Sequence, residues 1–121
     1  MDKTKAIGKF GEKIAEKYLL ENKYKILEKN YRCKYGEIDI IAKKKKDLIF
    51  IEVKTRTNMM YGDGINSIDW NKQKHIYKTA EYYLYGKNLK NIDIRIDAIE
   101  IFLYGTSLDL KHYQDIILEK P

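Results

Sequence analysis

Two short apolar segments of this 121-residue chain carry acidic residues where a buried strand would normally place apolar side chains. Residues 36–41 have the sequence Gly-Glu-Ile-Asp-Ile-Ile, and residues 48–54 have the sequence Leu-Ile-Phe-Ile-Glu-Val-Lys. Ionised groups are costly to bury unless they are paired or bind a metal ion. Asp39, Glu52 and Lys54 are therefore candidates for a site that holds a cation.

These residue types suit the hydrolysis of a phosphodiester with a divalent metal ion. Mg²⁺ is usually held by one or two carboxylates and by the substrate phosphate, and it keeps several waters. The ion lowers the pKa of its water, and a nearby ammonium can orient that water or stabilise the transition state. We therefore expect Asp39, Glu52 and Lys54 to form a nuclease site with Mg²⁺ or Mn²⁺ as cofactor. Because Glu and Lys pairs also decorate ordinary sheets, a salt-bridge network is the alternative.

Two antiparallel strands joined by a lysine-rich turn at 43–47 would bring these groups together. Side chains alternate between the two faces of a strand, so Glu37 and Asp39 should share one face. Ile38 and Ile40 should share the opposite face. If the two strands pair, the carboxylates of both can converge on one surface.

The remaining hydrophobic pattern predicts two helices and two further strands. Apolar side chains recur at helical spacing over residues 4–22 and 70–85, and they alternate over residues 24–33 and 91–103. The order helix, three strands, helix, strand predicts a single α/β domain over residues 1–121, with one central mixed sheet flanked by helices. After residue 107 the pattern is weak and fits a short strand or a turn.

The segments around the helices have local signals of their own. Gly8 and Gly11 lie on the apolar face of the first helix, which suggests that this helix closely approaches the sheet. Glu12 lies at the edge of that face, where it could be solvated or reach into a cleft. Ser67 or Asp69 can cap the second helix. The segment between the acidic strands and this helix, residues 57–64, is expected to be a loop beside the acidic cluster.

The chain is basic, and nearly all of its positive charge is lysine. The net charge is +6 and the pI is near 9.2. This permits a nucleic-acid partner, although a lysine-rich surface would give the same balance. The candidates for contacts with a nucleic-acid backbone flank the acidic cluster or line the second helix: Arg56, Lys72, Lys74 and Lys78. For the lysines at 43–46, a phosphate contact and a charged turn that discourages aggregation are both open.

The remaining composition argues against several other classes of protein. A single cysteine, Cys33, excludes an internal disulfide and a cysteine-rich zinc site. His75 and His112 are far apart in the sequence and are expected on the surface or on a helix face. No apolar run is long enough to span a membrane. We therefore expect a cytoplasmic protein with no membrane partner.

The motifs described above resemble those of the PD-(D/E)xK nuclease superfamily. They resemble more closely the small bacterial YraN-like family, whose members are regarded as endonucleases and are similar to archaeal Holliday junction resolvases. The matching segments are Gly8, Gly11-Glu12-x-x-Ala15, Gly36-Glu37-Ile38-Asp39-Ile40-Ile41-Ala42, Phe50-Ile51-Glu52-Val53-Lys54-Thr55-Arg56, Lys72-x-Lys74 and the strand that contains Asp97. The proline that precedes the aspartate in the superfamily pattern is absent here, a departure that is normal in the YraN-like family.

The resemblance implies a restriction-endonuclease-like core and a Mg²⁺- or Mn²⁺-dependent endonuclease that acts on nucleic acid. DNA is the expected substrate, with branched or junction DNA as one form of it. Asp39 and Glu52 would be metal ligands, and Lys54 would be the catalytic lysine. Glu12 would reach the metal site from the first helix. Gln73, one turn before a tyrosine, resembles the Gln-x-x-x-Tyr helix of RecB-like nucleases, with core packing as its alternative role.

Several hypotheses remain open from the sequence. Glu37 could be a third metal ligand, a partner for Lys54, or an acid paired with Arg56. The chain could also be a non-catalytic nucleic-acid-binding module that keeps the nuclease fold, or a small partner protein whose acidic cluster is a salt-bridge network. A homodimer would give two sites in a two-fold arrangement suited to a branched junction.

Overall fold

The computed structural model of the chain describes residues 3–57 and 70–116, with the backbone alone at 3–4 and 70–73. The predicted loop after residue 57 and the cap at Ser67 or Asp69 lie outside the described residues. In the part that is described, two helices and five strands follow in the order α1 (Lys3–Glu21), β1 (Lys25–Cys33), β2 (Gly36–Lys44), β3 (Asp47–Thr57), α2 (Trp70–Gly86), β4 (Asp93–Tyr104) and β5 (Ser107–Tyr113). These bounds agree closely with the two helices and four strands predicted from the sequence.

The strands form one mixed sheet in the order β1-β2-β3-β4-β5. Only β3 and β4 are parallel among these neighbours, and the other pairs are antiparallel. Parallel neighbours need a long crossover connection, and here that connection contains α2. The predicted mixed sheet is thus confirmed, as is the antiparallel pair β2 and β3.

Of the short strand and the turn left open after residue 107, the structure has the strand, β5, which the predicted element order did not include. This strand pairs antiparallel with β4, from Ala98 opposite Tyr113 to Tyr104 opposite Ser107. It lies at the edge of the sheet and is mostly exposed, with 51% of Leu108 accessible to solvent. An edge strand has one neighbour and little apolar surface to bury, so its hydrophobic alternation is weak.

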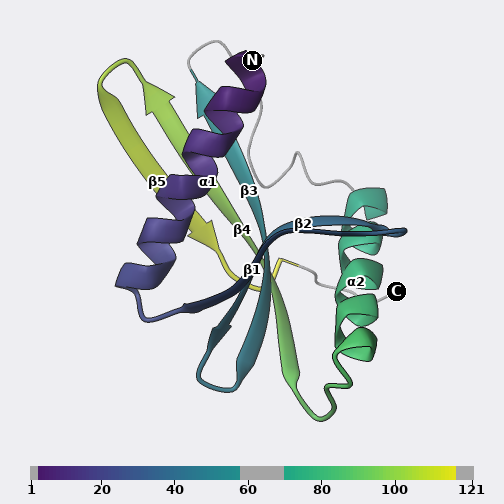
Figure 1. The fold of residues 1–121 in the computed structure, drawn as a ribbon. Coiled ribbons are helices and arrows are strands. Elements are labelled where there is room, and N and C mark those ends of the chain that lie inside the picture. Colours follow the sequence, from purple (N-terminus) through teal and green to yellow (C-terminus); the bar gives the residue numbers. More distant parts are fainter. Residues whose placement is uncertain (1–2, 58–69, 117–121) are drawn as a thin grey trace.

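The two helices cover opposite faces of the sheet (Figure 1). On one face, Ala15 and Leu19 of α1 pack with a cluster that includes Ile51 of β3. On the other face, Ile76 and Ala80 of α2 pack with a separate cluster centred on strand residues such as Phe50. Both apolar faces of the central strands are therefore buried, which explains their nearly continuous apolar sequences.

Gly11 allows α1 to lie directly on β3. A Cβ atom at Gly11 would overlap the side chain of Thr55, whose hydroxyl, Cβ and Cγ2 all lie too close. The close approach predicted from the glycines is therefore confirmed at Gly11. At Gly8, a Cβ atom would meet nothing within 4 Å, so that position does not need glycine for packing.

Replacing Gly11 by Ala should lower the free energy of unfolding by about 1–3 kcal/mol, because the new methyl group overpacks the contact with the β-branched Thr55. Urea unfolding followed by circular dichroism would measure this change. Gly8→Ala is the matched control on the same helix. It should raise stability by up to about 1 kcal/mol through helix propensity alone. Equal effects of the two changes would contradict the close approach.

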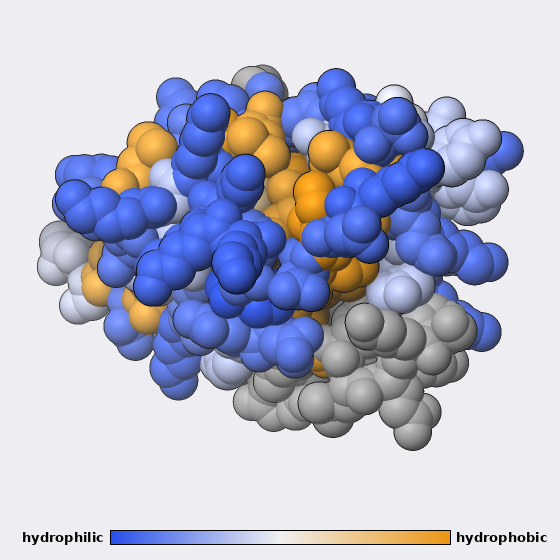
Figure 2. Space-filling model, turned by 90° about the horizontal axis from the view of Figure 1, so that it is seen from below, coloured by the Kyte–Doolittle hydropathy of each residue, from blue (hydrophilic) through white to orange (hydrophobic). Residues whose placement is uncertain are grey.

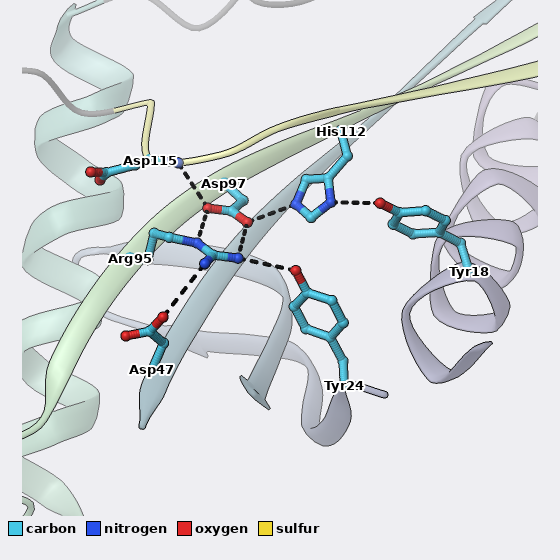
Figure 3. Close-up of polar contacts among 7 residues, drawn as sticks. All are labelled: Tyr18, Tyr24, Asp47, Arg95, Asp97, His112 and Asp115. Atoms are coloured by element: carbon cyan, nitrogen blue, oxygen red, sulfur yellow. Dashed lines mark hydrogen bonds and ion pairs between the residues drawn. The ribbon is translucent and has the colours of Figure 1, made fainter. Parts of the chain in front are cut away.

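A buried polar network joins α1, β3, β4 and β5 around Asp97, which has no solvent exposure (Figure 3). Arg95 donates from Nε to Asp97 Oδ1 at 2.9 Å and from a terminal nitrogen to Oδ2 at 3.0 Å. His112 Nε2 lies 2.7 Å from Oδ2, and the Asp115 N–H donates to Oδ1 at 2.9 Å. On its other side, His112 Nδ1 lies 2.8 Å from the hydroxyl of Tyr18 in α1.

The network corrects the prediction that His112 is a surface or helix-face residue. His112 lies in β5, its side chain is only 6% exposed, and its acidic partner Asp97 is fifteen positions earlier in the chain. Burial alone would raise the pKa of Asp97, but the hydrogen bonds from His112, Arg95 and the Asp115 amide outweigh it and lower that pKa. The ionised form of Asp97 is thus the one that the fold stabilises.

This lowered pKa predicts a specific acid sensitivity. An aspartate in the unfolded chain has a pKa of about 3.9, and the folded-state value of Asp97 lies below its ordinary one. Its contribution to stability is therefore complete above about pH 4 and is lost as the pH falls through the folded-state pKa.

Asp97→Asn should remove this part of the acid dependence and cost about 1–3 kcal/mol near neutral pH, because it weakens the charged hydrogen bonds at this buried position while Arg95 keeps its ion pair with Asp47. Thermal unfolding measured across an acid series would test both effects. The exposed Asp93, in the same strand, provides the control Asp93→Asn, which should keep the wild-type profile. If Asp97→Asn lost stability at low pH in the same way as the wild type, Asp97 would not be the source of the acid sensitivity.

Candidate active site

Asp39 lies at the point where β2 separates from β3. The pairing of the two strands runs from Lys44 opposite Asp47 to Ile40 opposite Ile51. Beyond this point the β1–β2 hairpin curves away from the rest of the sheet toward α2 (Figure 1). The Val53 N–H of β3 donates to Asp39 Oδ2 at 2.7 Å. The carboxylate of Asp39 is thereby attached to the middle of the Glu-Val-Lys segment of β3.

The bend at Asp39 also corrects the predicted faces of β2. Ile40 packs in the core under α1, whereas Ile38 packs in the core under α2, so the two do not share a face. Strict alternation holds only while a strand keeps its pairing, and β2 leaves β3 between these two residues. The change of face turns the Asp39 side chain into the gap between the strands.

Burial and several surrounding acids raise the pKa of Asp39. Burial is the largest cause, the negative charge of Glu52 is the next, and together with smaller contributions they raise the pKa of Asp39 to about 7. The hydrogen bond from Val53 opposes the shift, while Glu12 and Glu37 add to it. Burial also raises the pKa of Glu12, assisted by the charges of Glu37 and Glu52. These four acids therefore interact electrostatically, and a cation among them would relieve their repulsion.

The four acids line two separate hollows, one beside α1 and one beside α2. On the α1 side, Glu12, Glu37 and Asp39 line a hollow of about 610 Å³ together with basic and polar residues. On the α2 side, Glu37 and Glu52 line a smaller one of about 170 Å³ together with Gly36 and His75. Within the described parts of the chain, no group of three or more His, Cys, Asp or Glu side chains is placed to hold one metal ion.

Lys54 stays beside Glu52 on β3. Its ammonium lies 3.6 Å from Glu52 Oε1, and the two side chains are 29% and 11% exposed. The pair links the candidate catalytic lysine to a candidate ligand, and the partial burial of both groups makes the contact stronger than one at the surface.

The other predicted site residues lie in different surroundings. Arg56 Nε lies 3.4 Å from Glu100 Oε2, and the Arg56 side chain is only 14% exposed. On α2, Lys78 is exposed and Lys74 is partly buried. The backbones of Lys72 and Gln73 belong to α2, but their side chains lie outside the described residues.

Glu37 has a partner that none of the three sequence hypotheses included. It pairs with Arg32 across the β1–β2 hairpin, with Arg32 Nε 2.9 Å from Glu37 Oε2. Both side chains are well exposed, so this ion pair contributes little to stability.

The lysine-rich turn of the β2–β3 hairpin lies at the start of β3, whereas Glu52 lies in the middle of that strand. Lys43, Lys45 and Lys46 line a pocket of about 500 Å³ whose apolar wall includes Leu48 and Leu89. Figure 2 shows the molecule from below, where apolar surface is framed by hydrophilic side chains. None of the four interacting acids is among the described residues that line this pocket.

The fold and the site define an α/β protein with one mixed sheet and a group of interacting carboxylates at a strand separation. The model of the uncharacterised protein family UPF0102 matches residues 11–101, and the chain belongs to this family. The YraN-like resemblance is consistent with this assignment. In the described residues, no helix is long and apolar enough to cross a membrane.

Three relatives illustrate the extent of the similarity. A UPF0102 protein of Caldanaerobacter subterraneus subsp. tengcongensis is 44% identical over 113 residues, which cover 93% of each chain. One of Clostridioides difficile is 52% identical over 100 residues, covering 83% of this chain and 88% of the relative. One of Clostridium acetobutylicum is 43% identical over 114 residues, covering 93% of each chain.

The two functions of Asp39, as a hydrogen-bond acceptor and as a charge, can be separated by substitution. Asp39→Asn keeps a carbonyl oxygen for the Val53 amide and removes one negative charge, so it should raise the melting temperature near pH 8 in the presence of EDTA. Asp39→Ala leaves that amide without its acceptor and should cost about 1–3 kcal/mol. A melting temperature for Asp39→Asn below that of the wild type would contradict the repulsion among the acids.

Proposed function

We propose that the chain is a Mg²⁺- or Mn²⁺-dependent endonuclease of the PD-(D/E)xK type that hydrolyses phosphodiester bonds of DNA. The observation that carries the proposal is the hydrogen bond from the Val53 N–H to Asp39. It joins the carboxylate of one strand to the β3 segment that bears Glu52 and Lys54. This contact between the two strands supports the proposal that their residues act together.

The chemistry of the donor set fits a hard divalent cation. Asp39, Glu52 and Glu12 offer only oxygen ligands, and the pKa values of Asp39 and Glu12 are raised partly by neighbouring negative charge. Mg²⁺ needs only one or two carboxylates and completes its coordination with water and phosphate, so a closed cage of three ligands is not required. Asp39 and Glu52 would hold the ion, with Glu12 contributing from α1.

The residues of the chain would divide the remaining tasks. When bound, the metal ion supplies Lewis-acid stabilisation of charge on the phosphate and an acidified water. Lys54 lies beside Glu52 and would place a positive charge where negative charge develops during cleavage. The Val53 amide fixes the orientation of Asp39, and the contact of Gly11 with Thr55 sets the depth at which α1 presents Glu12.

The proposed substrate is DNA, and branched or junction DNA is one form of it. The net charge of +6 favours a polyanion, and lysines on α2 can contact phosphates beside the site. The preference for branched DNA, and a homodimer that would present two sites, rest on the similarity to Holliday junction resolvases.

A non-catalytic nucleic-acid-binding module is the second candidate function. It is favoured by one observation, namely that no three potential ligands converge within the described residues. Such a module would bind DNA with strong salt dependence but with an affinity that hardly changes with Mg²⁺.

Cleavage assays distinguish the two functions. The wild type should cut at least one of linear duplex, single strand, flap and four-way junction when Mg²⁺ or Mn²⁺ is present. Glu52→Gln and Lys54→Ala should each lower the rate by at least about a hundredfold, because the first removes a proposed metal ligand and the second a charge that stabilises the transition state. Isothermal titration calorimetry of Mn²⁺ with the wild type and Glu52→Gln provides a readout that does not depend on turnover.

Asp109→Asn, in the edge strand β5, is the matched control and should cut like the wild type. Circular dichroism should show that every variant folds. Cleavage that survives both Glu52→Gln and Lys54→Ala would refute the proposed site. DNA binding without cleavage or Mn²⁺ binding would establish the non-catalytic alternative.

A further inference from the structure

The tip of the β1–β2 hairpin and one face of α2 together form an exposed tyrosine surface. Its hollow measures about 520 Å³ and is lined by Tyr35, Lys78, Glu81, Tyr82 and Tyr85. The three tyrosines are 38%, 43% and 88% exposed, respectively. Neighbouring exposed aromatic side chains on one surface commonly mark a place where a ligand or partner binds.

Two of the rings are held in place by contacts within the molecule. Tyr35 packs edge-to-face against Tyr82, with ring centroids 5.8 Å apart, and Lys34 Nζ lies 5.2 Å from the Tyr35 centroid. The hairpin tip rests on α2, because a Cβ atom at Gly36 would lie 3.4 Å from Thr79 Oγ1. The tyrosine surface therefore joins two elements that are also part of the candidate active site.

The tyrosine surface and the hollow that contains Glu52 are lined by neighbouring residues of the same two elements. Tyr35 directly precedes Gly36, which lines that hollow together with His75 of α2. Lys78 and Tyr82 follow His75 at three and seven positions, so they lie on neighbouring turns of one helix face. At a rise of about 1.5 Å per residue, the helix covers about 15 Å from His75 to Tyr85.

We propose that the tyrosine surface binds the unpaired bases of a single-stranded DNA segment next to the phosphodiester that is cut. This inference rests on the proposed function and names the form of its substrate. In a duplex the faces of the bases are stacked on each other, so only an unpaired strand can offer them to aromatic side chains.

The charges around the tyrosine surface agree with this ligand. Lys34 and Lys78 flank the rings and can contact phosphates, and Glu81 is the one acid among the described residues that line the hollow. Every base has a π-face, so stacking on tyrosine is tolerant of sequence. This matches a chain in which no base-reading motif is recognised. The binding energy would then come from stacking and from phosphate contacts.

Binding can be measured separately from cleavage with the full chain, EDTA and a fluorescent oligothymidylate followed by anisotropy. The double change Tyr82→Ala and Tyr85→Ala should weaken binding by about tenfold or more, as expected for lost base stacking. Replacing both residues by Phe should preserve affinity, because stacking needs the ring and not the hydroxyl. Tyr85→Ala alone, at the most exposed of the three positions, should weaken binding without any effect on folding.

Two controls separate stacking from charge and from general surface effects. Tyr104→Ala removes a tyrosine of nearly equal exposure, 44%, at the end of β4, and should bind like the wild type. Lys78→Gln should reduce the slope of log affinity against log salt by about 0.7, whereas the tyrosine changes should leave that slope unaltered.

The proposal is overturned if the Tyr→Ala variants bind oligothymidylate as tightly as the wild type. It is also overturned if they lose affinity for a blunt duplex by the same factor, or if their only effect is on self-association in sedimentation. A different result would refute the proposed endonuclease without refuting the tyrosine surface. Tyrosine-dependent binding of single strands with no Mg²⁺- or Mn²⁺-dependent cutting would refute the endonuclease and leave the tyrosine surface established.

Discussion

The burial of the Asp97 carboxylate is the constraint on which the arrangement of this domain depends. A fully buried carboxylate must have its hydrogen bonds satisfied, and here the donors come from the Arg95 side chain, from β5 and from the backbone after β5. His112 extends the network to Tyr18 of α1, and Arg95 extends it to Asp47 at the start of β3. Asp97 lies next to Ile51 in the parallel pairing, one residue before Glu52. The network thus fixes the strand that carries the candidate active site.

The candidate active site exists because one strand departs from regular pairing. From Ile40 to Lys44, β2 pairs with β3 and contributes apolar side chains to both cores. Where this pairing ends, the Val53 N–H of β3 donates to the side-chain carboxylate of Asp39. The same separation lets the hairpin reach α2, where the tyrosine surface forms. The bend in β2 therefore places Asp39 at the candidate active site and Tyr35, at the tip of the hairpin, in the tyrosine surface.

Much of this arrangement could be predicted from the sequence because it depends on local periodicity. Both helices, the antiparallel hairpin and the close approach at Gly11 follow from spacing and from glycine within an apolar face. The edge strand β5 could not be predicted with the same confidence, since it buries little. The faces of Ile38 and Ile40 were predicted wrongly because alternation assumes a straight, paired strand.

The ion-pair partners also could not be predicted from the sequence, because they depend on the register in which the strands pair. Arg32 meets Glu37 only because the hairpin pairs those two positions, and His112 meets Asp97 only through the pairing of β4 with β5. A histidine at an alternating position of a weak strand gave no signal that it would be buried. Asp39 and Glu52 were recognisable as site residues because an acid within an apolar run is costly to bury unless it is paired or binds a metal ion.

The order of the strands also bears on how the molecule folds. The elements that carry Glu12, Asp39, Glu52 and Lys54 are α1, β2 and β3, and together with the intervening β1 they form one continuous segment of the chain joined by short turns. Pairing of β3 with β4 has to close a much longer loop, which contains α2, and such long-range contacts form slowly. During synthesis the segment with all four site residues leaves the ribosome before the strand that locks it. The candidate active site can therefore assemble early, while its rigidity is acquired only when β4 and β5 arrive.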